Sequence, residues 1–332
     1  MLNKFFIVIS GPTGVGKTDF ADMLAKSFEQ KLNLKTEIIN SDLGQFYSPL
    51  DIGTAKPDLK NCSNYSLFNI LDKPENFTVH DFRKLLISKF EELWDKQIIP
   101  IVVGGSMFYV KSIFFPPKEI EFQNLNSNTN PDIKCQDMAS HSVVDLYERL
   151  CSIDPERSRK INKNDRYRIE RALNLWYSSG KKPSEFMPEF SMPYGSNAVF
   201  YYLNRDRQEL YDIINNRTKK MFDAGLLEEV KNLDQTWKEF LIRKKIIGYD
   251  DVIDYLDNNL NNLDILIEQI NQRTRNYAKR QLTFYRQLIN LLEEENKNNI
   301  SIKDINQINL SELNIDLYID KLLLNLKEYI IK

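Results

Sequence analysis

The stretch from residue 11 to residue 18 constrains the fold of this chain more than any other. It fills every fixed position of the phosphate-loop pattern G-x-x-x-x-G-K-[ST]. The apolar run Phe5–Ile9 comes before the loop, and a helical stretch, Asp19–Gln30, comes after it. This order predicts a site for a di- or triphosphate, because the backbone N–H groups of the loop and the helix N-terminus attract negative charge. The loop residues are Gly11, Pro12, Thr13, Gly14, Val15, Gly16, Lys17 and Thr18.

Two side chains of the loop carry most of its expected chemistry. Lys17 would neutralise phosphate charge, and the hydroxyl of Thr18 would bind a Mg²⁺ ion. The alternative is a glycine-rich turn that binds nothing, which the complete pattern and its flanks disfavour. The loop by itself identifies neither the phosphate compound nor whether a phosphoryl group is transferred.

Apolar runs and helical patterns alternate through the first third of the chain. The runs 5–10, 36–41 and 98–103 have the continuous apolar character of buried strands, and helical stretches at 19–31 and 79–96 separate them. The second helix would begin after a Thr78 cap. This alternation predicts an α/β fold of the phosphate-loop NTPase type: a doubly wound parallel sheet with a helical insertion domain.

The composition of the chain changes after the third apolar run. A Pro- and Asn-rich connection that includes 124–131 leads into a helical pattern at 141–180, and 198–204 has the character of a returning strand. We therefore expect a first part of the core at 1–112, a helical insertion at 113–197, completion of the core at 198–295, and an Asn-rich tail of undetermined structure at 296–332.

The bulk composition limits the class of protein. The net charge of −2 does not indicate a nucleic-acid-binding protein, so such a function must depend on local basic patches. The three cysteines, Cys62, Cys135 and Cys151, lack metal-ligand spacing and are expected to be reduced thiols. No apolar run approaches the length of a membrane span. We expect a cytoplasmic monomer with no membrane partner.

Polar residues follow the second and third predicted strands. Asp42 comes directly after the run 36–41, and Ser106 follows Gly104 and Gly105 at the end of the next run. In α/β sheets ligands bind beyond the carboxyl ends of the strands, so Asp42 is placed for proton transfer or for Mg²⁺, and Ser106 for a phosphate or an amine. The alternatives are an Asp that caps a turn or helix and an ordinary strand-to-helix turn.

The first of two basic clusters occupies 164–173. Its arginines and Tyr167 suit phosphate contacts. In a nucleotide kinase, arginines of a lid would serve the same purpose. The alternative is a solvated helix face on which Glu170 pairs with the arginines.

The second basic cluster occupies 273–286. At about 100° per residue, Tyr277, Phe284 and Leu288 fall on one helix face. This pattern suits a helix that offers Arg280 inward to an anionic ligand and Arg275 and Lys279 outward to a nucleic-acid backbone. The alternative is arginines that lie over the edge of the core. The arginines beside the apolar face are Arg273 and Arg280, and the group on the opposite side is Arg275, Lys279 and Arg286.

Together these segments resemble the tRNA dimethylallyltransferase family, the isopentenyl transferases of tRNA. The resemblance extends from the N-terminus to about Arg286, and the string Asp51-Ile52-Gly53-Thr54-Ala55-Lys56-Pro57 is more specific to this family than the phosphate loop is. The strongest matches are 10–18, 39–57, 103–109, 164–173, 225–230, 247–249 and 274–286.

The resemblance implies transfer of a dimethylallyl group from its diphosphate to N6 of the adenosine 3′-adjacent to the tRNA anticodon. It implies Asp42 as general base and Ser106 as a contact of the target adenosine. With Lys17 from the phosphate loop and Arg280 from the late basic helix, these are the expected catalytic residues, and Mg²⁺ is the expected cofactor. The residues expected to contact the anticodon stem-loop are Asp42, Leu43, Gly44, Gln45, Ser106, Tyr167, Arg168, Arg171, Lys245, Gly248, Tyr249, Arg275, Lys279 and Arg280.

Several positions depart from the family pattern. Leu43 stands where the family usually has Ser, Gly44 is unusual, Ser106 replaces a Thr, Phe284 replaces a Trp, and Ile213 stands where an Arg is frequent. The lack of paired Cys and His near the C-terminus indicates a bacterial type. Two other functions remain open from the residues alone: a small-molecule or nucleotide kinase that uses Asp42 as base, and a non-catalytic ATPase that binds nucleic acid.

Overall fold

The computed structural model describes residues 2–61, 64–118, 138–258, 262–297 and 301–330. Two of the expected thiols, Cys62 and Cys135, and the connection 124–131 lie outside these residues, whereas Cys151 is a free thiol. The chain divides into two compact units, one formed by 1–114 and 191–332 and the other by 115–190. The expected insertion, 113–197, is slightly wider than the second unit.

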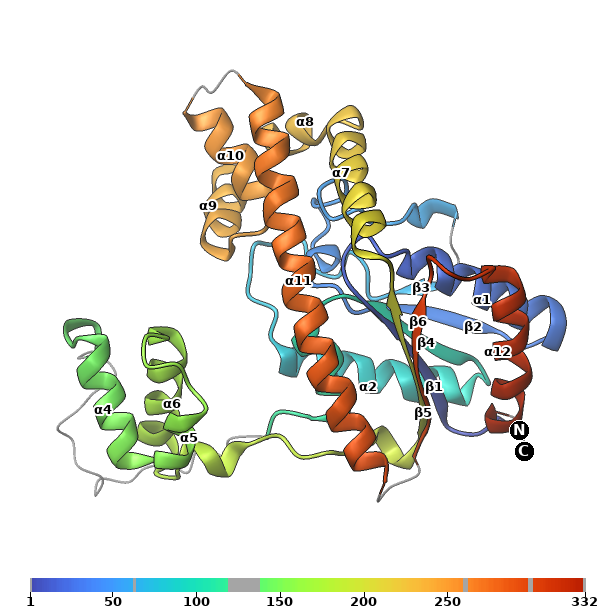
Figure 1. The fold of residues 1–332 in the computed structure, drawn as a ribbon, viewed down its shortest axis with the longest axis horizontal. Helices are drawn as coiled ribbons and strands as arrows, with labels where there is room; N and C mark the ends of the chain where they lie inside the picture. The colour runs from blue at the N-terminus through green and yellow to red at the C-terminus, as the bar shows by residue number, and fades with distance from the viewer. Residues whose placement is uncertain (1, 62–63, 119–137, 259–261, 298–300, 331–332) are drawn as a thin grey trace. The chain divides into compact units, whose positions relative to one another are not determined.

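The first unit contains a six-stranded sheet with the order β3-β2-β4-β1-β5-β6, in which every neighbouring pair is parallel (Figure 1). In its centre Ile9 pairs with Val103 of β4 and Tyr201 of β5. The α/β parallel fold expected from the sequence is confirmed. The strands are β1 (Phe5–Ser10), β2 (Thr36–Asn40), β3 (Tyr65–Ser66), β4 (Ile99–Gly104), β5 (Asn197–Asn204) and β6 (Ile302–Asn309).

Helices cover both faces of this sheet because alternate strand residues point to opposite sides. On one face Ile7 and Ile9 share a core with α1 (Lys17–Leu32) and α12 (Ile315–Ile330), which lie side by side in Figure 1. On the other face Phe6 stacks on Phe90 of α2 (Val79–Asp95) and also contacts Phe114 of α3 (Met107–Phe114). The expected Thr78 cap of α2 is confirmed as a capping box with Asp81.

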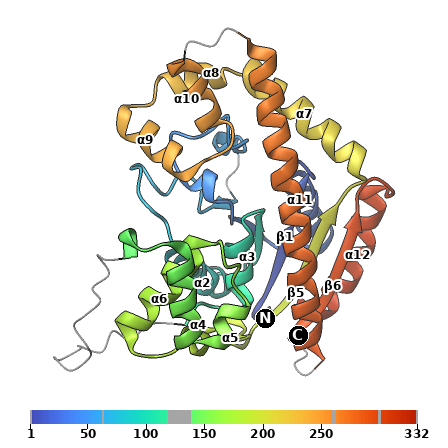
Figure 2. The ribbon, with the colours of Figure 1, turned by 60° about the vertical axis from the view of Figure 1, so that its left-hand side comes forward.

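The remaining helices of this unit follow β5. The long helix α11 contacts α7 and α10 in its first half and leads into β6 at its end (Figure 2). The tail that the sequence left undetermined adds the edge strand β6 and the helix α12, so it belongs to the core. These helices are α7 (Arg207–Asp223), α8 (Leu226–Lys231), α9 (Gln235–Lys244), α10 (Tyr249–Asp257) and α11 (Leu263–Asn296).

The second unit is a small helical body with a core of its own, built from α4 (Val143–Ile153), α5 (Pro155–Arg159) and α6 (Arg166–Ser179). Leu150, Ile169 and Leu173 are fully buried in that core. Helix α6 ends at Gly180, whose φ of 68° is the left-handed conformation that glycine adopts most easily.

Candidate active site

The phosphate loop connects β1 to α1 and forms one side of the candidate site. Gly14 and Gly16 have φ values of 80° and 98°, which allow the backbone to curl around a small volume. The ammonium group of Lys17 lies within this loop, where it donates to the carbonyls of Pro12 at 2.9 Å and Gly11 at 3.2 Å. Thr18 follows in the first turn of α1 and is half-buried.

Lys17 lies in an electrostatically coupled group of side chains. Burial is the main cause that lowers its pKa to about 8; the carboxylate of Asp42 raises the pKa, and the nearby charge of Arg217 lowers it. Burial thus opposes the positive charge of Lys17, and the carboxylate of Asp42 favours it.

Arg217 is a site residue that the sequence analysis did not identify. It extends from α7 and donates to the hydroxyl of Thr13 at 2.7 Å, and burial lowers its pKa. A signal was present, since Arg217 lies one helical turn after Ile213, the position where the family often has an Arg.

Asp42 follows β2 and caps the short 3₁₀ helix η1 (Leu43–Phe46). Its Oδ1 accepts from the amide of Gly44 at 3.3 Å, and its backbone N–H donates to the Asn40 side chain at 2.8 Å. The capping interpretation of Asp42 is therefore correct. It does not replace the catalytic one, because the same carboxylate acts electrostatically on Lys17.

The end of β4 joins the Asp42 segment to the phosphate loop. The hydroxyl of Ser106 accepts from the amide of Leu43 at 2.9 Å. Gln281 of α11, which the sequence analysis did not select, donates from Nε2 to the carbonyl of Gly105 at 2.9 Å and accepts the amide of Thr13 on Oε1 at 2.8 Å. A Cβ at Gly105 would come within 2.7 Å of that Nε2, so glycine leaves room for this hydrogen bond.

The buried face of α11 differs from the expected one. It is formed by Ala278, Gln281, Tyr285 and Leu288, whereas Tyr277 and Phe284 are only partly buried. The predicted face of Tyr277, Phe284 and Leu288 is therefore correct for Leu288 and wrong for the two aromatic residues, because helical periodicity was centred on their side chains rather than on the polar Gln281.

Tyr277 and Arg280 contact each other on this helix. Burial and the negative charge of Asp42 raise the pKa of Tyr277, and the Arg280 guanidinium lies 5.6 Å from the centre of its ring. Arg280 itself is exposed, so it is accessible to a ligand that approaches Asp42.

The prediction that the basic group on α11 faces outward is only partly correct. Lys279 is exposed. Arg275, by contrast, has a side chain only 14% exposed, because it donates to Asn215 of α7 at 2.8 Å and pairs with Glu268 at 2.7 Å. The spacing of the basic residues could not show that α7 packs against that side of the helix.

The segment 245–250 was expected to contact RNA, but only part of it is exposed. Lys245 is exposed, Gly248 caps α10 with a φ of 93°, and Tyr249 is fully buried. The Tyr249 hydroxyl donates to Glu229 at 2.6 Å, so its side chain does not face a ligand surface.

In the second unit, the expected residues lie on the outside of α6. Tyr167 is 71% exposed, and Arg168 and Arg171 are also exposed. Burial lowers the pKa of Arg157, and the positive charges of Arg171 and Arg168 lower it further. By contrast, Arg166 donates to the backbone carbonyl of Met138 at 2.6 Å and pairs with Glu170.

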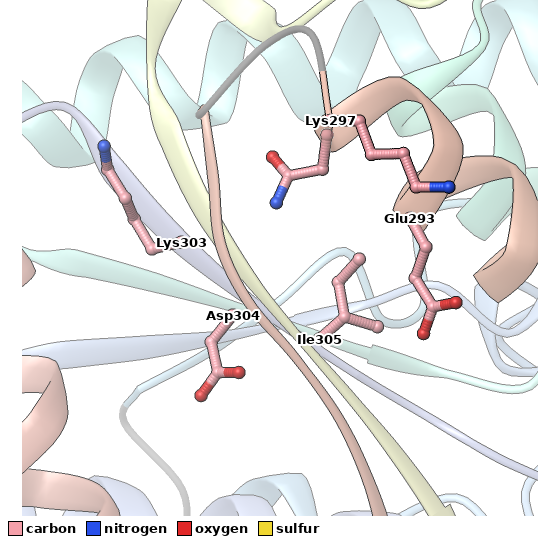
Figure 3. A pocket seen from close by; sticks show the side chains of 6 residues that line it. Glu293, Lys297, Lys303, Asp304 and Ile305 are labelled. Carbon is pink, nitrogen blue, oxygen red and sulfur yellow. The ribbon is translucent and has the colours of Figure 1, made fainter.

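A separate surface pocket of about 330 Å³ lies where α11 ends and β6 begins. Figure 3 shows Glu293 of α11 on one side and Asp304 and Ile305 of β6 on the other. Because β6 is parallel to β1, its start lies at the amino edge of the sheet, whereas the phosphate loop, Asp42 and Ser106 lie at the carboxyl edge.

Two properties hold for the residues that the structure describes. Every helix in that part of the chain is too short or too polar to span a bilayer. No three His, Cys, Asp or Glu side chains within the described ranges lie close enough to hold a metal ion together.

The fold and site define a phosphate-loop enzyme whose ligands meet at the carboxyl ends of three adjacent strands, β1, β4 and β2. The IPP transferase family model matches residues 45–288. The chain belongs to this family, so the resemblance found in the sequence is confirmed and the kinase alternative is not favoured.

Similar proteins cover nearly the whole chain. A tRNA dimethylallyltransferase of Finegoldia magna is 36% identical over 96% of this chain and 99% of its own length, and one of Bacillus subtilis is 34% identical over 84% and 87%. Among solved structures, the tRNA isopentenylpyrophosphate transferase of Bacillus halodurans has a TM-score of 0.60 at 28% identity and covers 98% of this chain and 96% of its own. A eukaryotic dimethylallyltransferase acting on tRNA has a TM-score of 0.68 at 28% identity, over 84% and 69%.

Proposed function

We propose that this chain transfers the dimethylallyl group of dimethylallyl diphosphate to the exocyclic N6 amine of the adenosine 3′-adjacent to the anticodon in tRNA. The observation that carries the proposal is the meeting of a phosphate-binding loop, two half-buried cations and one carboxylate at a single edge of the sheet. A group that stabilises a departing diphosphate thus lies beside a group that accepts a proton.

Each of these residues acts on a different part of the reaction. The bond from the allylic carbon to the diphosphate oxygen breaks as the bond from that carbon to N6 forms. Lys17, Arg217 and the loop amides stabilise the negative charge that develops on the diphosphate. The Asp42 carboxylate accepts the proton that N6 loses. Arg280, exposed beside Tyr277, contacts the approaching RNA or the leaving group.

A divalent metal, Mg²⁺ in our proposal, accompanies the diphosphate. The hydroxyl of Thr18 fits such an ion because Mg²⁺ prefers oxygen ligands and retains waters and substrate phosphate oxygens in its shell. When bound, the ion would supply further positive charge to the leaving group.

Transfer to N6 requires the adenine to leave the stacked anticodon loop. The exposed Arg168, Arg171 and Lys279 are suited to phosphates of the anticodon stem-loop, and Tyr167 to stacking. We propose a bacterial cytoplasm, where tRNA is present, as the compartment, and a monomer as the working form.

Incubation with dimethylallyl diphosphate and unmodified tRNA tests the proposal. Mass spectrometry of the nucleosides should show adenosine with one added dimethylallyl group, and sequencing of the modified fragment should locate it 3′ of the anticodon. Unmodified adenosine, together with phosphate transfer from ATP to a small alcohol, would support a kinase instead.

A further inference from the structure

The family-specific string 51–57 forms a tight loop that is held by a side chain from a distant helix. The carboxylate of Glu229, in α8, accepts the backbone amides of Asp51 at 3.1 Å, Ile52 at 2.7 Å and Gly53 at 3.1 Å. Hydrogen bonds to an ionised acceptor are about twice as strong as neutral ones, so this carboxylate fixes the start of the loop.

Tyr249 completes this contact from α10. Its hydroxyl donates to the same carboxylate at 2.6 Å, and its fully buried ring covers Gly53 so closely that a Cβ there would lie 2.5 Å from the ring carbon Cε2. Burial and the charge of Glu229 raise the pKa of Tyr249, so the hydroxyl stays protonated and continues to donate.

The other end of this loop holds the turn that carries Asp42. Gln45 of η1 donates to the carbonyls of Thr54 at 3.1 Å and Ala55 at 3.3 Å. A Cβ at Gly44 would lie 2.8 Å from the methyl group of Thr54, so the unusual Gly44 permits close packing of η1 on the loop. Movement of the loop would therefore move the helix whose N-terminus Asp42 caps.

We propose that Glu229 and Tyr249 are positioning residues for the prenyl transfer. They hold Asp42 in place through the 51–57 loop. The proposal rests on the function proposed above. Because Tyr249 directly follows Gly248 and lies close in the chain to the exposed Lys245, the same contact connects the α9–α10 turn, a candidate RNA surface, to the proton acceptor.

The test uses Glu229→Gln and Tyr249→Phe, alone and combined with Asp42→Ala. Displacement of a reacting group by about 1 Å can cost up to about 10²-fold in rate. We expect single-turnover rates, at saturating tRNA and diphosphate, to fall by about tenfold or more in each single variant, with diphosphate affinity unchanged. Neither substitution should slow Asp42→Ala further. The matched control is Glu228→Gln, which should keep the wild-type rate. The Glu228 side chain is 66% exposed and forms an ion pair with Lys231 on the same helix.

Additive losses in the combined variants, or a wild-type rate in both single variants, would overturn the proposal. Amide hydrogen exchange provides a readout that does not depend on activity: Glu229→Gln should accelerate exchange at 51–53 and also at 44–45. Acceleration confined to 51–53 would show that the loop does not hold η1. If the wild type transfers no prenyl group, the proposed function is wrong. The exchange experiment then still tests whether Glu229 holds η1 through the loop. If Glu229→Gln does not fold, Tyr249→Phe, which removes only a hydroxyl, takes its place.

Discussion

Arg217 donates to the hydroxyl of Thr13 at 2.7 Å and thereby brings a half-buried guanidinium from α7 against the phosphate loop. The residues are separated by 204 positions in the chain. Burial of a cation is unfavourable without a compensating partner, and a bound diphosphate would supply one.

Arg217→Ala should therefore weaken binding of dimethylallyl diphosphate and leave tRNA affinity unchanged. Loss of a charge-assisted contact of about 1.5 to 3 kcal/mol corresponds to roughly 10-fold to 10²-fold weaker binding. Calorimetric titration with the diphosphate measures the effect. Arg207→Ala on the same helix, where Arg207 lies over the Tyr211 ring, is the control and should bind normally. Equal affinities in wild type and Arg217→Ala would remove Arg217 from the site.

Asp42→Asn should separate the two roles of Asp42. Asparagine is as good a helix N-cap as aspartate, so η1 should remain intact, whereas an amide is not a proton acceptor. We expect turnover to fall by about 10²-fold or more, with tRNA binding largely unchanged, in both Asp42→Asn and Asp42→Ala. Rapid-quench measurements of prenyl transfer check this. Turnover of Asp42→Asn close to that of the wild type would leave only the capping role.

The pKa of Lys17 predicts a pH dependence of diphosphate binding. The folded-state pKa is lowered from 10.5 to about 8, so the ammonium is charged below about pH 8 and becomes neutral as the pH rises through that value. Affinity for the diphosphate should therefore fall above about pH 8. In the free protein, the burial penalty of the charged form is present below about pH 8 and disappears by about pH 10.5, so this group favours folding more at high pH.

Lys17→Arg provides the control for that experiment, since arginine stays charged throughout the range. Its affinity should be lower than that of the wild type but flat between pH 7 and pH 9. A wild-type affinity that does not change over the same range would contradict the titration of Lys17 at this site.

The basic residues of α11 should give three different results. Lys279→Ala should make the slope of log K for tRNA binding against log salt concentration shallower, by about 0.7 to 0.9 per lost phosphate contact. Arg275→Ala should lower the melting temperature, because Arg275 is tied to Asn215 and Glu268. Arg280→Ala should slow transfer more than it weakens tRNA binding. Salt titrations, thermal melts and single-turnover rates distinguish the three variants, and identical behaviour in all would indicate a solvated charge run.

Much of the fold follows from local patterns. The strands β1, β4 and β5 are largely apolar runs that are buried on both faces, and the phosphate loop occupies the expected position between β1 and α1. The edge strand β6 escaped detection because its sequence, IKDINQIN, is largely polar, and such a strand gains its stability from pairing with β5.

The sequence alone determined the phosphate loop, the positions of Asp42 and Ser106 at strand ends, and the family, because these depend on residues that are close together in the chain. Only the tertiary structure decided which distant side chains complete the site. Arg217 and Gln281 reach the loop from α7 and α11, while Arg275 and Tyr249 turn to intramolecular partners. Helical periodicity gives the face of a helix, but the partner of that face is set by long-range packing, which no local pattern encodes.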